Sequence, residues 1–237
     1  AATLTTCGTG SEMAEEEPLN FVLIFTDEMD PGYLECYDSI SPFPTPRITE
    51  LAASGTMFTD AYVTAPMCTP SRFSVLTGKY AGRCTAEGFL GQYSYDEPYS
   101  IAWNTRINRP MQTIADYLSE VGYVTGMAGK WHVGAEDVNR PDIPGFTGDE
   151  QVTDPGMDEK LQAHQQVMRE LVRETAGFDE AYSVLWGNFD NFPVRQLRVH
   201  NIPWITMGAA KFLDNRAVDG QPFFLYVAPT AVHGPGH

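Results

Sequence analysis

Continuous apolar runs and helical periodicities alternate along this chain of 237 residues. The run at 19–26 (LNFVLIFT) is typical of a strand buried on both faces of a parallel sheet. A second run at 223–228 (FFLYVA) follows a Gly- and Pro-containing turn signal and predicts another such strand. Between them, segments 57–63 and 123–129 also read as strands.

Helical signals separate these strands. Proline at position 46 follows a candidate cap, Thr45, and predicts a helix that ends at Ser54 before Gly55. Three further helices are predicted from apolar residues on one face: Met111, Ile114, Ala115 and Leu118; Leu161, Met168, Leu171 and Val172; Ile205, Ala209, Phe212 and Leu213. The alternation predicts an α/β fold, a mostly parallel sheet flanked by helices on both faces.

Composition and charge narrow the classes of partner. Hydrophobic residues make up 43% of the chain, which is ordinary for a globular protein. Acids outnumber bases 31 to 15, for a formal net charge of −16, which argues against a nucleic-acid partner. A site for an anion must therefore be a local cluster of cations that works against the net field. No apolar stretch reaches the length of a membrane span.

Residues 1–18 are small and polar and then acidic, which predicts a disordered tail left after removal of a signal segment. We therefore expect a secreted or extracytoplasmic protein, in a periplasm, an extracellular space or a lysosome-like compartment. Cys7 in this tail is a weak candidate for a lipid anchor.

The four cysteines form no C-x-x-C pair, and their spacing neither indicates nor excludes a Cys36–Cys84 disulfide. Segments 83–109 and 139–156 are predicted surface loops, suited to substrate specificity.

The strongest local pattern is Cys68-Thr69-Pro70-Ser71-Arg72, followed by Leu-Thr-Gly at 76–78. Thr69 can cap a helix that starts at Pro70 and ends near Gly78. Cys68 would then lie just ahead of the helix N-terminus, where free N–H groups favour negative charge, and Arg72 could fold back as an anion clamp. A buried cysteine before a capped helix, with Arg72 in a surface ion pair, fits the same pattern equally well.

Two other pairs carry candidate chemistry. Asp27 and Glu28 follow the first strand and offer adjacent hard oxygen ligands for Ca²⁺ or Mg²⁺, although an acidic turn at a strand end looks the same. Lys130 and His132 are two residues apart in a predicted extended segment, so both should point to one side. There they could hold an anion and transfer protons, or be a surface lysine and a packed histidine.

Four segments in order give a resemblance to a known family. The pattern C-x-P-S-R with L-T-G at 68–78, together with 20–37, 122–134 and 222–235, resembles the formylglycine-dependent sulfatases of the alkaline-phosphatase-like superfamily. The resemblance covers nearly the whole chain from Asn20 onward. One departure is Glu28, because the family usually has Asp at this second position.

The resemblance implies a site and a reaction, hydrolysis of sulfate esters. Cys68 would be oxidised by a separate formylglycine-generating enzyme to an aldehyde, whose hydrate attacks sulfur through one hydroxyl and expels sulfate through the other. Arg72, Lys130, His132 and His233 would be catalytic, with Lys130, His132 and His233 contacting sulfate or the leaving oxygen. Asp27, Glu28 and residue 68 would bind a divalent metal, most simply Ca²⁺, with Mg²⁺ as the alternative. The substrate would be a sulfated small molecule or a sulfated glycan.

Three residues fall outside this set. His164 and His200 match no family position and are read as structural or surface residues, and Trp131 as packing. In the family, a further metal-ligating segment and a late lysine lie beyond the strand that precedes His233. Residues 19–237 are therefore predicted to be the N-terminal portion of a catalytic domain, apparently truncated. The alternatives are a phosphonate or phosphate ester hydrolase of the same fold, a non-catalytic binder of sulfated glycans, or an inactive fragment.

Overall fold

A computed structural model describes residues 17–91, 101–133, 146, 148, 150–188, 192–199 and 201–234. Within these residues, four strands form one sheet in the order β1-β4-β2-β3. They are β1 (Phe21–Ile24), β2 (Val124–Lys130), β3 (Glu180–Leu185) and β4 (Phe223–Ala228). Each neighbouring pair is parallel, so all four carboxyl ends lie at the same edge of the sheet.

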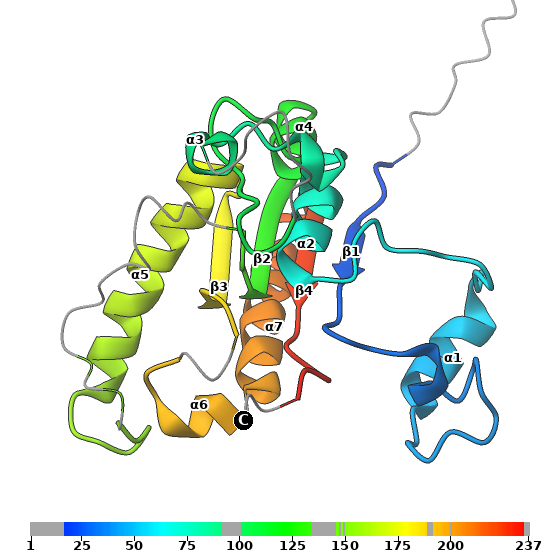
Figure 1. The fold of residues 1–237 in the computed structure, drawn as a ribbon. Coiled ribbons are helices and arrows are strands. Elements are labelled where there is room, and N and C mark those ends of the chain that lie inside the picture. Colours follow the sequence, from blue (N-terminus) through cyan, green and yellow to red (C-terminus); the bar gives the residue numbers. More distant parts are fainter. Residues whose placement is uncertain are drawn as a thin grey trace, which may run out of the picture.

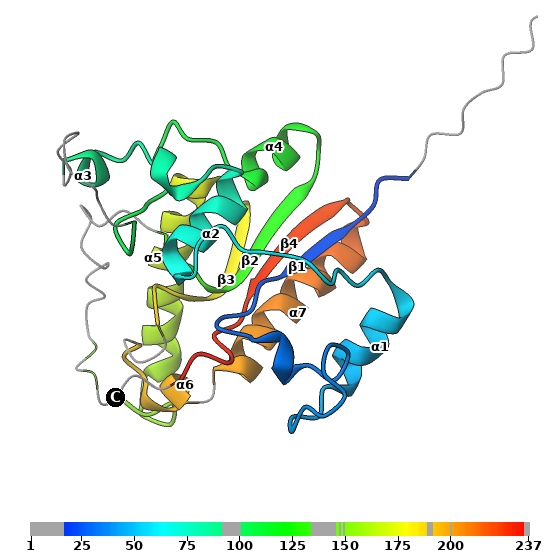
Figure 2. The same cartoon turned by 45° about the vertical axis from the view of Figure 1, so that its right-hand side comes forward.

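Helices cover both faces of this sheet (Figures 1 and 2). One face packs against α2 (Cys68–Thr77), α4 (Ile114–Glu120) and α5 (Met157–Ala176), and the other against α6 (Arg195–Val199) and α7 (Ile202–Asp219). Side chains of β4 alternate between the two cores, with Phe224 and Tyr226 in the first and Leu225 in the second. The predicted α/β fold with a parallel sheet is confirmed.

The strand β1 lies at the edge of the sheet, and the prediction that it is buried on both faces is wrong. Phe21, Val22 and Ile24 are exposed. Among the described residues β1 pairs with β4 alone. The helix α1 (Pro46–Ser54) stands away from the sheet in Figure 2 and has no buried residue. An apolar run indicates that a strand has side chains suited to burial, but it does not indicate which helices or strands pack against them.

The helix predictions are confirmed for α1, α4, α5 and α7, with α1 bounded as predicted. A capping box of Thr113 and Asp116 starts α4. Segment 57–63 forms no strand, so that prediction is wrong, whereas β3 was not predicted at all. The remaining short elements are η1 (Pro31–Tyr33), η2 (Ala81–Arg83) and α3 (Glu87–Leu90).

Several predictions fall on residues outside the described part. These are most of the tail, Cys7, His200 and stretches of the two predicted loops. Cys36 and Cys84 are both free cysteines, so they form no disulfide with each other. In the part of the chain that the structure describes, no helix is long and apolar enough to cross a membrane.

Candidate active site

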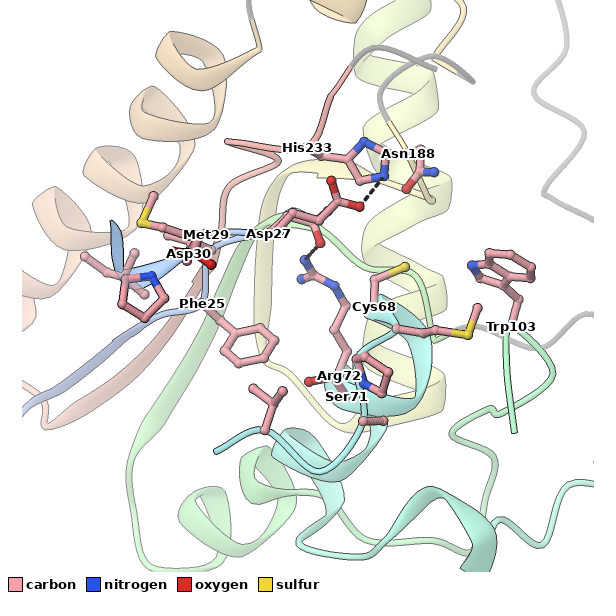
Figure 3. A pocket seen from close by; sticks show the side chains of 18 residues that line it. Phe25, Asp27, Met29, Asp30, Cys68, Ser71, Arg72, Trp103, Asn188 and His233 are labelled. Atoms are coloured by element: carbon pink, nitrogen blue, oxygen red, sulfur yellow. Dashed lines mark ion pairs between the residues drawn. The ribbon is translucent and has the colours of Figure 1, made fainter. Parts of the chain in front are cut away.

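A pocket of about 550 Å³ opens beside the carboxyl edge of the sheet, where α/β proteins bind ligands (Figure 3). Its lining brings together residues that lie far apart in the sequence: Asp27 after β1, Cys68 and Arg72 of α2, Asn188 after β3 and His233 after β4. Four of these were predicted from the sequence. Asn188 was not, because it follows the unpredicted strand β3 and belongs to no motif.

The helix α2 begins earlier than predicted. Met67 is its N-cap, with extended backbone angles, and the first helical bond runs from the Ser71 N–H to the Met67 carbonyl at 3.1 Å. The Thr69 hydroxyl caps nothing and has no hydrogen-bond partner among the described residues. Pro70 fits the first turn because the N–H it lacks would have no helical partner there. Cys68 is therefore the first residue of the helix rather than the residue before it. The predicted stop is confirmed, since Gly78 adopts the left-handed conformation at φ 66°.

Arg72 is fully buried, which excludes the surface ion pair considered from the sequence. Its Nη1 donates to the carbonyl of Lys130 at 3.2 Å and to the Tyr226 hydroxyl at 3.1 Å. Its Nη2 lies 3.6 Å from Asp27 Oδ1, and its guanidinium carbon lies 5.5 Å from the centre of the Phe25 ring. These contacts fix the guanidinium beside the pocket, while Nε and Nη2 form no hydrogen bond with the described residues.

Lys130 ends β2 and lies beneath the pocket. Its Nζ donates to Asp27 Oδ2 at 2.6 Å and to Asn188 Oδ1 at 2.5 Å, and both Lys130 and Asp27 are buried. One buried carboxylate therefore faces two buried cations, Lys130 and Arg72, so this buried group has an excess of one positive charge, while Glu28 and Asp30 add carboxylates to the rest of the pocket lining. This is the local cation cluster that an anion site needs in an acidic chain. Neither Lys130 nor His132 lines the pocket.

His132 approaches Cys68 by a route that was not predicted. The register of β2 shifts between Ala128 and Lys130, and His132 itself has a φ of 54°, so the segment is not extended there. Its Nδ1 lies 3.2 Å from the Cys68 Sγ. Burial, together with the positive charges of Lys130 and Arg72, lowers the pKa of His132 to about 3. The imidazole is therefore neutral at pH 7 and only a weak base while the pocket holds no anion.

Glu28 and His233 meet at the open side of the pocket. Glu28 has a φ of 56°, and its exposed Oε1 lies 3.5 Å from His233 Nε2. Two backbone bonds hold the loops together: the Asp27 N–H donates to the Ala231 carbonyl at 2.9 Å, and the Val232 N–H donates to the Asp27 carbonyl at 2.7 Å. The loop after β1 and the loop after β4 thus present their side chains to one space.

The described residues were expected to supply part of a metal site. No cluster of three or more His, Cys, Asp or Glu side chains among them could hold a metal ion. Asp27 and Glu28 are nevertheless adjacent hard oxygen donors that line one pocket, which is the chemistry Ca²⁺ and Mg²⁺ select. The donor types fit a hard divalent cation, and these two carboxylates would be part of its shell.

The other sequence interpretations concern packing. Trp131 is completely buried in the core beneath α2, as expected. His164 is buried between two aromatic rings, 4.9 Å from the centre of Phe192 and 6.3 Å from that of Phe146, and lies outside the pocket. This buried position agrees with the interpretation of His164 as a structural residue.

Comparison with known proteins decides the family. The family model described as Sulfatase matches residues 19–237, nearly the whole chain. The chain belongs to the sulfatase family. The resemblance inferred from the C-x-P-S-R pattern and its three companion segments is therefore confirmed.

Curated relatives of this sulfatase chain include two enzymes of different origin. Arylsulfatase A of Homo sapiens is 41% identical over 138 residues, which cover 56% of this chain and 25% of the relative. N-acetylgalactosamine-6-O-sulfatase of Bacteroides thetaiotaomicron is 40% identical over 115 residues, which cover 48% of this chain and 20% of the relative. The sulfatase chain thus matches about a quarter or less of the length of these relatives.

Solved structures share the fold of the sulfatase chain. Ps i-CgsB in complex with k-i-k-neocarrahexaose is 25% identical with a TM-score of 0.55, covering 92% of this chain and 46% of that one. BT4656 in complex with its substrate D-glucosamine-2-N,6-O-disulfate is 20% identical with a TM-score of 0.52, covering 92% and 35%. The second likeness supports the fold alone.

Proposed function

We propose that the protein carrying this chain hydrolyses sulfate esters, with residue 68 as the nucleophile after oxidation of Cys68 to formylglycine. One observation carries the proposal. Cys68 opens α2 in a pocket backed by an excess of buried positive charge, and its Sγ lies 3.2 Å from a neutral imidazole. A nucleophile, an anion-binding cluster and a proton acceptor are the parts that this reaction requires.

Sulfate binding falls to Arg72 and Lys130, assisted by the N–H groups of the first turn of α2. Arg72 lines the pocket and keeps two nitrogen atoms without a hydrogen bond among the described residues. Lys130 contributes its charge from beneath, through Asp27 and Asn188. Because these cations are buried, their attraction for an anion is screened less than it would be at the surface.

Proton transfer divides between two histidines. His132 is neutral and contacts residue 68, and the negative charge of a bound sulfate would raise its pKa, so it could then take a proton from the group at that position. His233 stands at the pocket wall, where its Nε2 pairs with Glu28, and it can protonate the departing alcohol oxygen. The two roles require histidines on different elements, as the loops after β2 and β4 provide.

Asp27 and Glu28, with an oxygen of the modified residue 68, would hold a divalent cation, most simply Ca²⁺ with Mg²⁺ as the alternative. Bound there, the cation would add positive charge beside the sulfate and increase the acidity of an oxygen bound to it. Asp27 is already held by Lys130 and Arg72, so its carboxylate is oriented before any ligand arrives.

The names of the relatives support the proposed substrate class. They include an N-acetylgalactosamine-6-O-sulfatase and a complex with k-i-k-neocarrahexaose, which supports a sulfated glycan or a sulfated small molecule as substrate. A formylglycine-generating enzyme would act during maturation. A secreted or extracytoplasmic location is consistent with such substrates.

The test is chemical analysis of residue 68. Cleavage at Arg47 and Arg72 releases the peptide 48–72. In protein from a host with the converting enzyme, this peptide should carry an aldehyde that reacts with hydrazide, and the protein should hydrolyse aryl sulfates faster than aryl phosphates. An unmodified thiol in fully active protein would contradict the formylglycine, and a preference for the phosphate would indicate the phosphate ester hydrolase instead.

A further inference from the structure

Trp103 is an exposed aromatic side chain in the lining of the candidate active site. It lines the same pocket as Cys68, Arg72 and His233, and 58% of its surface is exposed. Trp131, by contrast, is completely buried. Figure 3 shows Trp103 on the side of Cys68 away from Asp27 and Arg72. The cationic groups and the indole therefore lie at different ends of one pocket.

The backbone around Trp103 is well held although its side chain is not. The Ala102 N–H donates to Asn104 Oδ1 at 2.9 Å, and the Thr105 hydroxyl donates to the Ala102 carbonyl at 3.3 Å. Thr105 and Arg106, which follow, are buried. Within the described part of the chain, the indole forms no ring contact or hydrogen bond with another residue. A hydrogen-bonded turn thus presents a large ring that does not pack into the core.

The pocket is much larger than a sulfate group needs. It holds about 550 Å³, within the range of sites that enclose a small organic ligand. With the sulfate at the cationic end, the alcohol portion of an ester must extend through the remaining space. Met67 and Pro66 add apolar surface to the lining. An indole face carries negative charge density and attracts C–H groups and the edges of aromatic rings.

We propose that Trp103 binds the ring of the leaving alcohol, so that this site prefers sulfate esters of ring-bearing alcohols over open-chain ones. The inference deepens the proposed function and rests on it. Two kinds of ring could bind the indole in this way. A pyranose offers a face of C–H groups, and an aryl group offers a π system. A rigid aromatic platform serves this purpose at low cost, because Trp loses little conformational freedom when it binds.

The experiment measures binding without turnover, in the protein with Cys68→Ala. Phenyl sulfate, a hexopyranose 6-sulfate, n-hexyl sulfate and inorganic sulfate are titrated calorimetrically. Trp103→Ala should weaken binding of at least one ring ester about tenfold and leave n-hexyl sulfate and inorganic sulfate within about twofold. Trp103→Phe should retain most of the ring preference. Whichever ester loses affinity in Trp103→Ala, the phenyl or the pyranose ester, identifies the kind of ring that Trp103 binds.

Tyr117→Ala is the matched control, because Tyr117 is a similarly exposed aromatic residue of α4 that does not line this pocket. It should change none of the four affinities. Equal losses for n-hexyl and ring esters in Trp103→Ala, or no loss for either, would overturn the role of Trp103 while leaving sulfate binding intact. Failure of inorganic sulfate and every ester to bind the Cys68→Ala protein with Trp103 intact would overturn the proposed function and this inference with it.

Discussion

Lys130 Nζ lies 2.6 Å from Asp27 Oδ2, and both side chains are buried. This contact joins a residue expected to bind metal to a residue expected to bind sulfate, 103 positions apart in the sequence. Neither group can be removed without leaving the charge of the other in a site with little solvent. Removing either charge should therefore both lower the free energy of unfolding and change the net charge beside the pocket.

Lys130→Met should destabilise the fold by about 3–5 kcal/mol, because Asp27 would keep only the more distant Arg72 as a charged partner. Urea unfolding measures the change. The double variant Asp27→Asn with Lys130→Met should recover part of the loss, since no lysine-paired carboxylate remains. Strictly additive effects of the two substitutions would show that the contact carries no coupling energy.

Asn188→Asp should weaken binding of inorganic sulfate by about tenfold or more, because a new carboxylate beside Lys130 cancels the excess positive charge. Calorimetric titration at low ionic strength measures the affinity. Asn215→Asp provides the matched control, since Asn215 lies on α7 and contacts Tyr182 and Glu180 away from the pocket. A similar loss in both variants would mean that overall charge, rather than the position of Asn188, determines the affinity.

His132 should remain neutral from pH 8 down to about pH 4, given a pKa of about 3 in the folded protein. In the unfolded chain a histidine titrates near pH 6.5, so only the unfolded state gains this proton as the pH falls from about 6.5 toward 3. The contribution of His132 to stability is therefore present above pH 6.5 and decreases below it. Ring ¹⁵N shifts in metal-free protein report the protonation directly. A midpoint near 6.5 for His132 in the folded state would contradict the buried, cation-flanked position.

The parts of the site that the sequence predicts are those marked by a local pattern, either helix periodicity or the end of an apolar run. Cys68 and Arg72 share the first turns of α2, and their spacing alone places both at its N-terminal end. Asp27 and His233 follow apolar runs, so a parallel sheet brings them to one edge. These features depend on helix periodicity and strand order, which a sequence records.

The rest depends on contacts between distant segments. Lys130 is buried against Asp27, and His132 has a left-handed backbone conformation. Both features depend on how the end of β2 packs against its neighbours, and the hydrophobic periodicity of the sequence does not indicate that packing. Asn188 was missed because β3 (EAYSVL) has no continuous apolar run and the loop after it carries no motif. The apolar run predicted strand β1 correctly. It could not indicate that, among the described residues, no other strand pairs with the outer edge of β1.

The central claim is that residue 68 becomes a nucleophile that must release sulfate through a second hydroxyl on the same carbon. The most direct test is the reaction of the Cys68→Ser variant with 4-nitrophenyl sulfate, followed by mass analysis of peptide 48–72. A serine hydroxyl can attack sulfur beside His132, but it has no second hydroxyl with which to expel the product. We expect a single burst of nitrophenol and a stable sulfo group on residue 68. Sustained turnover by the variant at the rate of the unsubstituted protein would contradict it.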